Sequence, residues 1–268
     1  MIMALLVILV PFAWLLISAV SSQADLITIP LNWLPEHPTL DRLGDLLFGS
    51  NAHATDFRAS IWNSLVVTST TTAIAMVTGV LAAYAFARLR FPGRGWLIFA
   101  FMAAYMLPGI AIILPLYSFL SAVGGLDTPW ALIFVYSSFV TPFVIWLMRG
   151  YFETVPSEID DAARTDGCSR LGALWRVILP VCIPGLVSTA LLAFLLCWDE
   201  FFFALILTST DAAKTLPVAI NDFIGRYTVD FPLLASGGLI AAIPPVFIAL
   251  VFQRHIIAGL TAGSVKGS

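Results

Sequence analysis

The chain has 268 residues, of which 60% are hydrophobic and only 11% are charged, and its mean hydropathy is +0.96. A soluble domain carries about 25% charged residues, so this chain has too few polar side chains to cover a globular surface. The net charge of −3 and the absence of a long basic run argue against nucleic-acid binding. Composition therefore predicts a protein whose solvent is the lipid bilayer.

Six apolar stretches are long enough to cross a membrane, because a hydrocarbon core about 30 Å thick needs roughly 20 helical residues. They cover about residues 1–20, 61–87, 96–123, 130–148, 183–207 and 233–252. Backbone polar groups in lipid must be satisfied within the segment, so all six are expected to be helices, with kinks at Pro108, Pro115 and Pro142. The sequence thus predicts an all-α polytopic membrane protein, with six transmembrane helices in one domain covering residues 1–268.

The first stretch raises the question of a signal peptide, because Ser22, Gln23 and Ala24 follow an apolar region as a cleavage site would. No basic residue precedes that region, and cleavage would leave an odd number of spans. We expect the first stretch to remain as a helix. The polar segment 23–57 holds three prolines and predicts an outer loop with little regular structure of its own.

Lys and Arg residues predict the orientation, because the cytoplasmic loops of membrane proteins are enriched in them. Nine of the 13 lie after the second stretch, after the fourth stretch or in the C-terminal tail, whereas four lie in the opposite loops. The opposite loops instead collect most of the carboxylates. Both termini are therefore predicted to be cytoplasmic, which agrees with an even number of spans.

The cytoplasmic loop after the fourth stretch predicts two short helices joined by a tight turn. Ser157 can cap the first helix with Asp160 as its capping-box partner, and Gly167 can adopt the left-handed conformation that ends it. Ser169 can cap a second helix, which Pro180 is expected to stop. The apolar face of that helix has the spacing i, i+3, i+4 and i+7 and consists of Leu171, Leu174, Trp175 and Ile178. Composition and periodicity leave open a helix that merely lies on the membrane.

The order of residues in this loop resembles the EAA loop of binding-protein-dependent ABC importer permeases. That pattern is an acidic residue, two alanines, a DGA-like turn and a distal LP. The loop spans residues 155–180, and the matching residues are Asp161, Ala162, Ala163, Asp166, Gly167, Cys168, Leu179 and Pro180. Asp161 replaces the usual Glu, and Cys168 replaces the usual Ala.

The resemblance covers essentially the whole chain and is greatest to the sugar-importer branch, similar to the second membrane subunit of the maltose transporter. Further matching segments are 63–65, 82–88, 91–93, 198–201, 252–254 and 259–267. The resemblance implies a MetI-like permease fold in a bacterial inner membrane. It also implies import of a carbohydrate, which means a sugar, an oligosaccharide or a polyol.

The resemblance further implies a subunit that works only in a complex. Its partners would be a second homologous permease, a dimer of ATP-binding subunits and an extracytoplasmic substrate-binding protein. EAA helices dock into a cleft on the ATPase, so Asp161 would be the acidic contact, Ala162 and Ala163 would permit close approach, and Gly167 would fit the cleft. The outer loop 209–232 would face the binding protein. The tail residues that would also reach the ATPase are Gly263, Ser264, Val265 and Lys266.

The chain itself shows no sequence sign of enzymatic chemistry. It contains no G-x-x-x-x-G-K-[S/T] phosphate cradle and no nucleophile–base arrangement, so we expect neither an ATPase nor another enzyme. ATP and Mg²⁺ are expected on the partner subunit, with no cofactor or metal in this chain. His37, His53 and His255 are scattered over loops and the tail, where a lone histidine is usually solvated.

Trp198, Asp199 and Glu200 lie about 16 residues, or roughly 24 Å, into the fifth stretch. Ionisable residues at such depth usually face a cavity or a partner, which predicts a translocation pathway. Solvation near the outer interface, packing against a sister subunit and an interfacial anchor role for Trp198 remain open. A transporter driven by H⁺ or Na⁺ would use Asp199 and Glu200 for coupling, but would leave the EAA-like pattern unexplained. An intramembrane enzyme would need a catalytic pair within the spans, and the sequence has none.

Overall fold

The structure is a computed structural model that describes residues 2–225 and 229–264. In those ranges all regular elements are helices, apart from one isolated β-bridge between Ile224 and Val229. The all-α prediction is therefore confirmed. The long helices are α1 (Ile2–Val20), α4 (Ala52–Arg88), α7 (Pro129–Thr154), α11 (Ile183–Trp198) and α14 (Phe231–Ser264).

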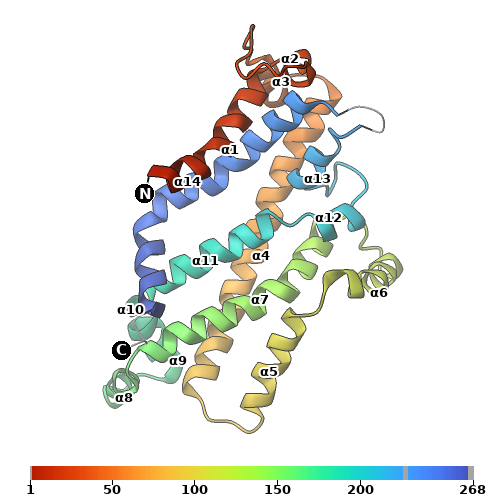
Figure 1. Ribbon diagram of the computed structural model, residues 1–268. Helices are drawn as coiled ribbons and strands as arrows, with labels where there is room; N and C mark the ends of the chain where they lie inside the picture. Colours follow the sequence, from red (N-terminus) through yellow and green to blue (C-terminus); the bar gives the residue numbers. More distant parts are fainter. Residues whose placement is uncertain (1, 226–228, 265–268) are drawn as a thin grey trace.

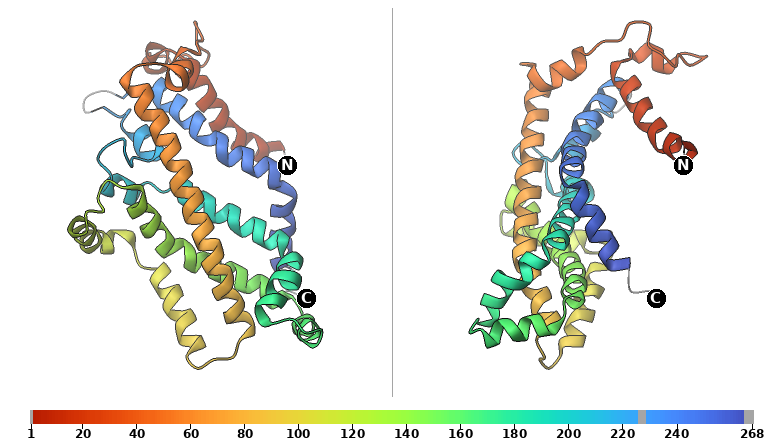
Figure 2. Two further views of the ribbon diagram at one scale, coloured as in Figure 1. Left: turned by 180° about the vertical axis from the view of Figure 1, so that it is seen from behind. Right: turned by 90° about the vertical axis from the view of Figure 1, so that its left-hand side faces the viewer.

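Five helices form one layer, and α4 lies across its face. Along that layer α1, α14, α11, α7 and α5 (Arg94–Tyr105) follow one another, and each packs on the next (Figure 1). The helix α4 crosses α7 and α11, as the view from behind shows (Figure 2). Gly79 permits the close approach of α4 to α7, because a Cβ at this position would lie 2.6 Å from Cγ1 of Val144. The main hydrophobic core lies along this crossing.

Three helices of the described ranges are long and apolar enough to cross a membrane by themselves, namely α4, α7 and residues Phe231–Arg254 of α14. Two further spans result if each of two bent helix pairs counts as one span. The first predicted stretch contains a shorter apolar helix, Val7–Val20. These criteria identify three to five spans, so they establish a polytopic helical protein but do not confirm the predicted count of six.

The third predicted stretch is not one kinked helix. It divides into α5 and α6 (Gly109–Ala122), whose axes differ by 89°. Pro108 stands at the break and precedes the first residue of α6, where its missing N–H costs no helical hydrogen bond. Pro115 and Pro142 instead lie inside α6 and α7, and both helices continue through them.

The fifth predicted stretch is also divided. Its first helix, α11, ends at Trp198, and α12 (Phe202–Leu207) begins after a short break. The carboxylate of Glu200 accepts hydrogen bonds from the N–H groups of Phe203 at 2.9 Å and Ala204 at 3.2 Å. These bonds satisfy N–H groups at the start of α12 that have no partner within the helix. The prediction of a single helix over 183–207 is therefore wrong.

The polar segment 23–57 contains more regular structure than predicted. It holds α2 (Gln23–Ile27), α3 (Asp41–Phe48) and the first residues of α4. Ser22 and Asp25 form a capping box at the start of α2, and Asn51 caps α4 by accepting a hydrogen bond from the N–H of Ala54 at 2.8 Å. The prediction of little regular structure is wrong, because these local capping signals outweigh the effect of the prolines between them.

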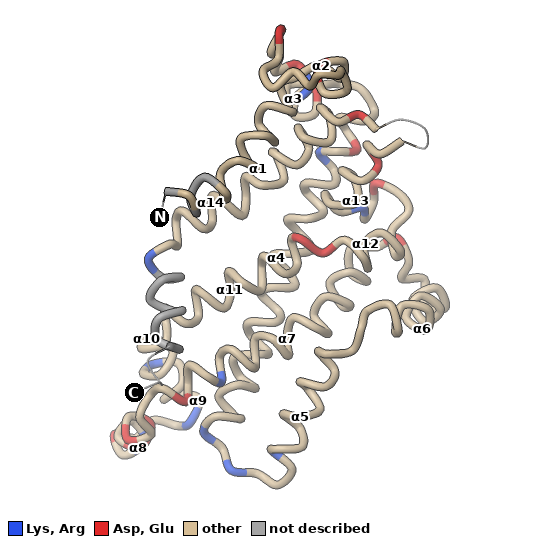
Figure 3. Tube along the Cα trace, viewed as in Figure 1, with Lys and Arg blue, Asp and Glu red and all other residues tan. Residues whose placement is uncertain are grey.

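Charged residues divide the molecule into two ends (Figure 3). Lys and Arg gather at the turn between α4 and α5 and near the short helices 157–181, whereas Asp and Glu gather around α2, α3 and α13 (Leu216–Asn221) and on 157–165. We call the end with the α4–α5 turn and residues 155–182 the inner end. The opposite end, with α2, α3 and residues 208–225, is called the outer end.

Candidate functional site

The EAA-like loop forms a helix, a turn and a second helical segment at the inner end. The first helix is α8 (Ser157–Thr165), and Gly167 follows it with a φ of +89°, in the left-handed region that favours glycine. The second segment consists of α9 (Arg170–Ala173), a π-helical turn (Leu174–Ile178) and α10 (Leu179–Val181). Ser169 caps α9, as predicted, because its hydroxyl accepts a hydrogen bond from the N–H of Gly172 at 3.1 Å.

Two local predictions for this loop are wrong. Ser157 is the first residue of α8 rather than its cap, and no side-chain cap is present there. Pro180 does not stop the second helical segment, which continues through it from the π-helical turn to Val181. The chain instead turns at Cys182, where the axis of Arg170–Val181 differs by 84° from that of α11.

The predicted apolar stripe of the second helix is divided between two faces. Leu174 and Ile178 are buried, whereas Leu171 and Trp175 are exposed by 59% and 60%. The division runs between residues three apart, since Leu171 is separated from Leu174 and Trp175 from Ile178, in a segment that contains a π-helical turn. Half of the predicted stripe therefore faces away from the bundle.

The motif residues present a small acidic tip. Asp161, Ala162, Asp166 and Gly167 are exposed, and Ala163 packs inward. A Cβ placed on Gly167 would meet no atom within 4 Å, so the turn projects into open space. Of the remaining motif residues, Cys168 is half-buried, Leu179 is buried and Pro180 is exposed. An exposed carboxylate beside small residues is suited to close contact with a basic partner surface.

The predicted contact residues of the tail are only partly covered by the structure. Gly263 and Ser264 are the last two residues of α14. Val265 and Lys266 lie outside the described residues. Their contact with an ATPase stays a prediction.

The three residues of the predicted pathway have different surroundings. Trp198 is only 3% exposed, stacks on Phe194 and donates a hydrogen bond from Nε1 to the carbonyl of Ala241 at 3.1 Å. Glu200 caps α12, as described above. Asp199 is exposed and lines a cavity of about 770 Å³.

That cavity lies between the end of α11, α13 and the middle of α14. Most of its lining is apolar and includes Phe12, Trp198 and Phe201, and its polar side chains are Asp199 and Asn221. A mainly apolar cavity with a few polar groups has the composition typical of small-molecule sites. Of the three predicted pathway residues, Asp199 is therefore the one whose polar group is available to a solute.

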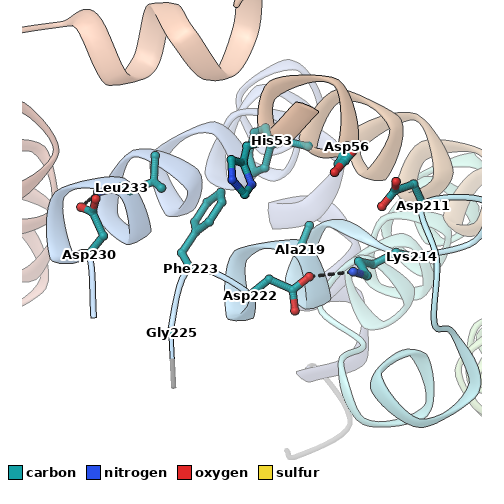
Figure 4. Close-up of a pocket in the computed structure, with 11 residues that line it drawn as sticks. His53, Asp56, Asp211, Lys214, Ala219, Asp222, Phe223, Gly225, Asp230 and Leu233 are labelled. Atoms are coloured by element: carbon teal, nitrogen blue, oxygen red, sulfur yellow. Dashed lines mark hydrogen bonds and ion pairs between the residues drawn. The ribbon is translucent and has the colours of Figure 1, made fainter. Parts of the chain in front are cut away.

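A second cavity, of about 450 Å³, lies at the outer end between the start of α4, residues 211–225 and the start of α14 (Figure 4). Asp56 and Asp211 lie on the same side of it with their carboxylates directed at each other, and Lys214 forms an ion pair with Asp222 at 2.7 Å. Desolvation and the carboxylate of Asp56 raise the pKa of Asp211. The hydrogen bond and charge of Asp222 raise the pKa of Lys214.

Sequence reasoning treated these carboxylates as part of a general excess in the outer loops and did not place them together. His53 lines the same cavity. Among the described residues, no three His, Cys, Asp or Glu side chains are placed to hold a metal ion. The sequence could not have indicated this cluster, because the residues that form it come from two segments, 53–56 and 211–230, that are distant in sequence.

The described residues thus form an all-helical fold with broken spans, an exposed helix pair at the inner end, and the cavity beside Asp199, which we call the lateral cavity. Residues 75–261 match the model of a family described as the inner membrane component of binding-protein-dependent transport systems. The chain belongs to this family. It is therefore a transport subunit of a membrane and not itself an enzyme.

Two relatives cover most of the chain. It is 41% identical over 213 residues to the trehalose transport system permease protein SugB of Mycobacterium tuberculosis, a match that covers 79% of this chain and 78% of that protein. It is 34% identical over 263 residues to the trehalose/maltose transport system permease protein MalG of Thermococcus litoralis, covering 98% and 93%.

The fold is also similar to a solved structure, that of a bacterial ABC transporter involved in the import of the acidic polysaccharide alginate. The TM-score is 0.78 at 22% identity, and the match covers 94% of this chain and 92% of that one. The predicted ABC importer permease fold is thereby supported over nearly the full length.

Proposed function

We propose that this chain is one of two membrane subunits of an ATP-driven importer for a carbohydrate. The observation that carries the proposal is the match to sugar-transport permeases over almost the entire chain, 98% in the case of MalG. The EAA-like loop supports the proposal, because its acidic tip is exposed and therefore free to contact a separate subunit. The inner end would face the cytoplasm, with both termini on that side.

In this mechanism the ATPase supplies the energy and this chain converts it into movement. Asp161 would contact a basic side chain of the ATPase, while Ala162 and Gly167 permit close approach of the two backbones. Closure of the ATPase dimer would displace α8 and thereby tilt the helices packed behind it. ATP and Mg²⁺ would be held by the partner, whose chemistry this chain does not share.

The lateral cavity would form half of the pathway, and the second permease would close it. Asp199 and Asn221 can accept and donate hydrogen bonds to sugar hydroxyls, while the apolar lining contacts the less polar faces of a sugar ring. At the outer end, the loop 209–232 would receive the substrate-binding protein. Which carbohydrate is carried would depend on that protein and on the second permease as well as on this chain.

The test is purification of the tagged chain from its host in mild detergent, followed by reconstitution of the co-purified proteins into vesicles. We expect a P-loop ATPase and a second permease to co-purify, and sugar uptake to require ATP inside the ATPase-facing compartment. Uptake by this chain alone, without ATP and dependent on an ion gradient, would overturn the proposal and favour the ion-coupled alternative with Asp199 and Glu200.

A further inference from the structure

Two adjacent acidic residues of α8 have opposite surroundings. Asp161 is exposed, whereas Asp160 is only 7% exposed. Oδ2 of Asp160 lies 2.7 Å from Nε of Arg88, and Tyr84 donates a hydrogen bond from its hydroxyl to Oδ1 of Asp160 at 2.8 Å. Both oxygens of this buried carboxylate are therefore engaged by α4.

Arg88 also joins α4 to the residues that precede α8. Its Nη2 donates a hydrogen bond to the carbonyl of Val155 at 2.6 Å. Arg88 is the last residue of α4, and Tyr84 lies one turn earlier on the same side of the helix. The ring of Tyr84 is buried and packs edge-on against Phe152, which belongs to α7.

These contacts fix the position of a helix that otherwise has little buried surface. Of the nine residues of α8, the buried ones are Asp160 and Ala163, and an alanine is too small to set the orientation of a helix. Ile159 is half-buried and packs against the main core, and α8 otherwise packs chiefly on α9 and the π-helical turn of its own loop. The carboxylate of Asp160 is thus the polar connection from α8 to α4, beside the apolar contact of Ile159.

We propose that Arg88, Tyr84 and Asp160 form an inner latch that makes α8 move together with α4. In this role Asp160 is a positioning residue: it does not touch the ATPase but holds the neighbouring Asp161 at a fixed angle to it. The inner latch rests on the proposed function, since it has a task only if α8 receives the movement of an ATPase.

The latch is suited to transmit movement because α4 is long and continuous. It has 37 residues, which corresponds to about 55 Å of helix, and it reaches from the inner end to the outer cavity. If α8 is rigidly joined to Arg88, a displacement of α8 would tilt α4. It would also tilt α7, the helix that packs most extensively on α4. A loosened latch would let α8 rotate without moving α4.

The experiment compares Asp160→Asn, Arg88→Gln and the double variant in the complex reconstituted with its ATPase, second permease and binding protein. The readout is the number of sugar molecules taken up per ATP hydrolysed, measured per assembled complex. We expect each single variant to assemble and hydrolyse ATP, since Asp161 is intact, and the ratio to fall about tenfold. The double variant should be no worse than either single variant, because both remove the same interaction.

Two results would overturn the latch. One is an unchanged ratio in both single variants, even if the amount of complex falls, because that is the behaviour of a residue that only supports folding. The other is multiplication of the two losses to about a hundredfold in the double variant, which indicates independent roles.

If the single variants do not assemble because an unpaired charge stays buried, Tyr84→Phe provides the measurement, since it removes one hydroxyl and keeps the ring. We expect a two- to threefold lower ratio, and an unchanged one would contradict the latch. Glu153→Gln, an exposed acid outside α8, is the matched control and should leave the ratio unchanged. Failure of the unsubstituted complex to transport with ATP would instead refute the proposed function.

Discussion

The two ends of α4 are held by different chemistry. At the inner end, Arg88 contacts the charged side chain of Asp160. At the outer end, the hydroxyl of Ser64 accepts a hydrogen bond from the backbone N–H of Leu216 at 2.7 Å. Asn63 likewise donates to the backbone carbonyl of Asp211 at 2.8 Å. At the inner end the ion pair joins two side chains, beside the bond from Arg88 to the carbonyl of Val155, whereas both outer contacts join a side chain to the backbone.

This difference determines which sequence changes each end tolerates. A buried ion pair fails when either partner loses its charge, and the charge that remains is left without compensation. A contact to the backbone depends on one side chain only, so the loop that it holds can change its own side chains. The outer loop can therefore vary its own side chains, as its proposed contact with a binding protein would require, whereas Arg88 and Asp160 at the inner end depend on each other.

The largest effect is expected at the exposed face of the inner end. Asp161→Lys places a positive charge where a basic residue of the ATPase is proposed to bind, so like charges would meet at the contact. We expect the protein to insert normally but to lose ATPase association and uptake entirely. Co-purification of the ATPase and uptake in vesicles are the measurements.

Glu153→Lys is the control for this change, because Glu153 is an exposed acid near the same end but outside α8. It should retain most of the uptake. Normal uptake by the Asp161→Lys variant would show that the ATPase binds elsewhere. The proposed ATPase contact at the inner end would then be wrong.

The second effect concerns the cavity between the two ends. Asp199→Asn keeps the shape of the side chain and removes its charge, which weakens hydrogen bonds to sugar hydroxyls by about 1–2 kcal/mol. We expect uptake to fall roughly tenfold, while the ATPase still co-purifies at the normal ratio. Unchanged uptake would mean that Asp199 serves the packing of the sister subunit instead.

Local signals explain which parts of the fold and site could be predicted. The apolar runs predicted α4, α7 and α14, and the turn at Gly167 and the cap at Ser169 follow from residue types at fixed offsets. The inner latch could not be predicted, because Tyr84 and Asp160 are 76 residues apart and no local sequence pattern indicates that they are in contact. Asp160 was instead assigned to a capping box.

The break in the third stretch shows the same limit. A proline within an apolar run predicts a kink or a break, and the sequence alone does not choose between them. Here the first residue of α6 is Gly109, and a Cβ on it would lie 3.0 Å from the ring of Phe203. Packing against a distant helix thus accompanies the turn at Pro108. By contrast, the capping box of Ser22 and Asp25 is a local signal that could have predicted α2 from the sequence, although prolines follow it.

The outer end is tested by a pair of buried serines on α4. Ser64→Ala leaves the N–H of Leu216 without its partner, which we expect to cost about 1–3 kcal/mol. Ser60→Ala is the control, because its hydroxyl donates within α4 to the carbonyl of Phe57. The thermal midpoint of the purified protein should fall clearly more for Ser64→Ala. Equal shifts would mean that the outer contact contributes nothing beyond an ordinary buried hydroxyl.

Two glycine-to-alanine substitutions, which we expect to change the stability in opposite directions, test the turn at the inner end. Gly167→Ala forces a side chain into the left-handed region and should destabilise by about 1–2 kcal/mol. Gly150→Ala, inside α7 and equally open to space, should stabilise by about 0.5–1 kcal/mol. Thermal unfolding measures both effects. A gain of stability in both variants would show that the turn does not need its glycine.

The smallest effect is expected at Asp127, which holds the start of the outer loop. Its carboxylate accepts hydrogen bonds from the N–H groups of Ser209 at 2.8 Å and Thr210 at 3.0 Å. Desolvation alone would raise the pKa of Asp127, but these donors outweigh it and lower the pKa below the ordinary 3.8. Asn tolerates the positive φ of this position, so Asp127→Asn removes the charge without straining the backbone.

We expect the Asp127→Asn variant to lose under about 1 kcal/mol of stability, because the site is exposed. We also expect trypsin to cleave this variant faster after Lys214 at pH 7. A group with a lowered pKa stabilises above its ordinary pKa and loses that contribution as the pH falls through the lowered value. The difference between the original and variant loops should therefore shrink as the pH falls below 3.8 and disappear once the pH is below the lowered pKa, a range in which pepsin can replace trypsin as the probe. A difference that persists there would assign the effect to side-chain shape, and the outer end would then hold its loop without any contribution from charge.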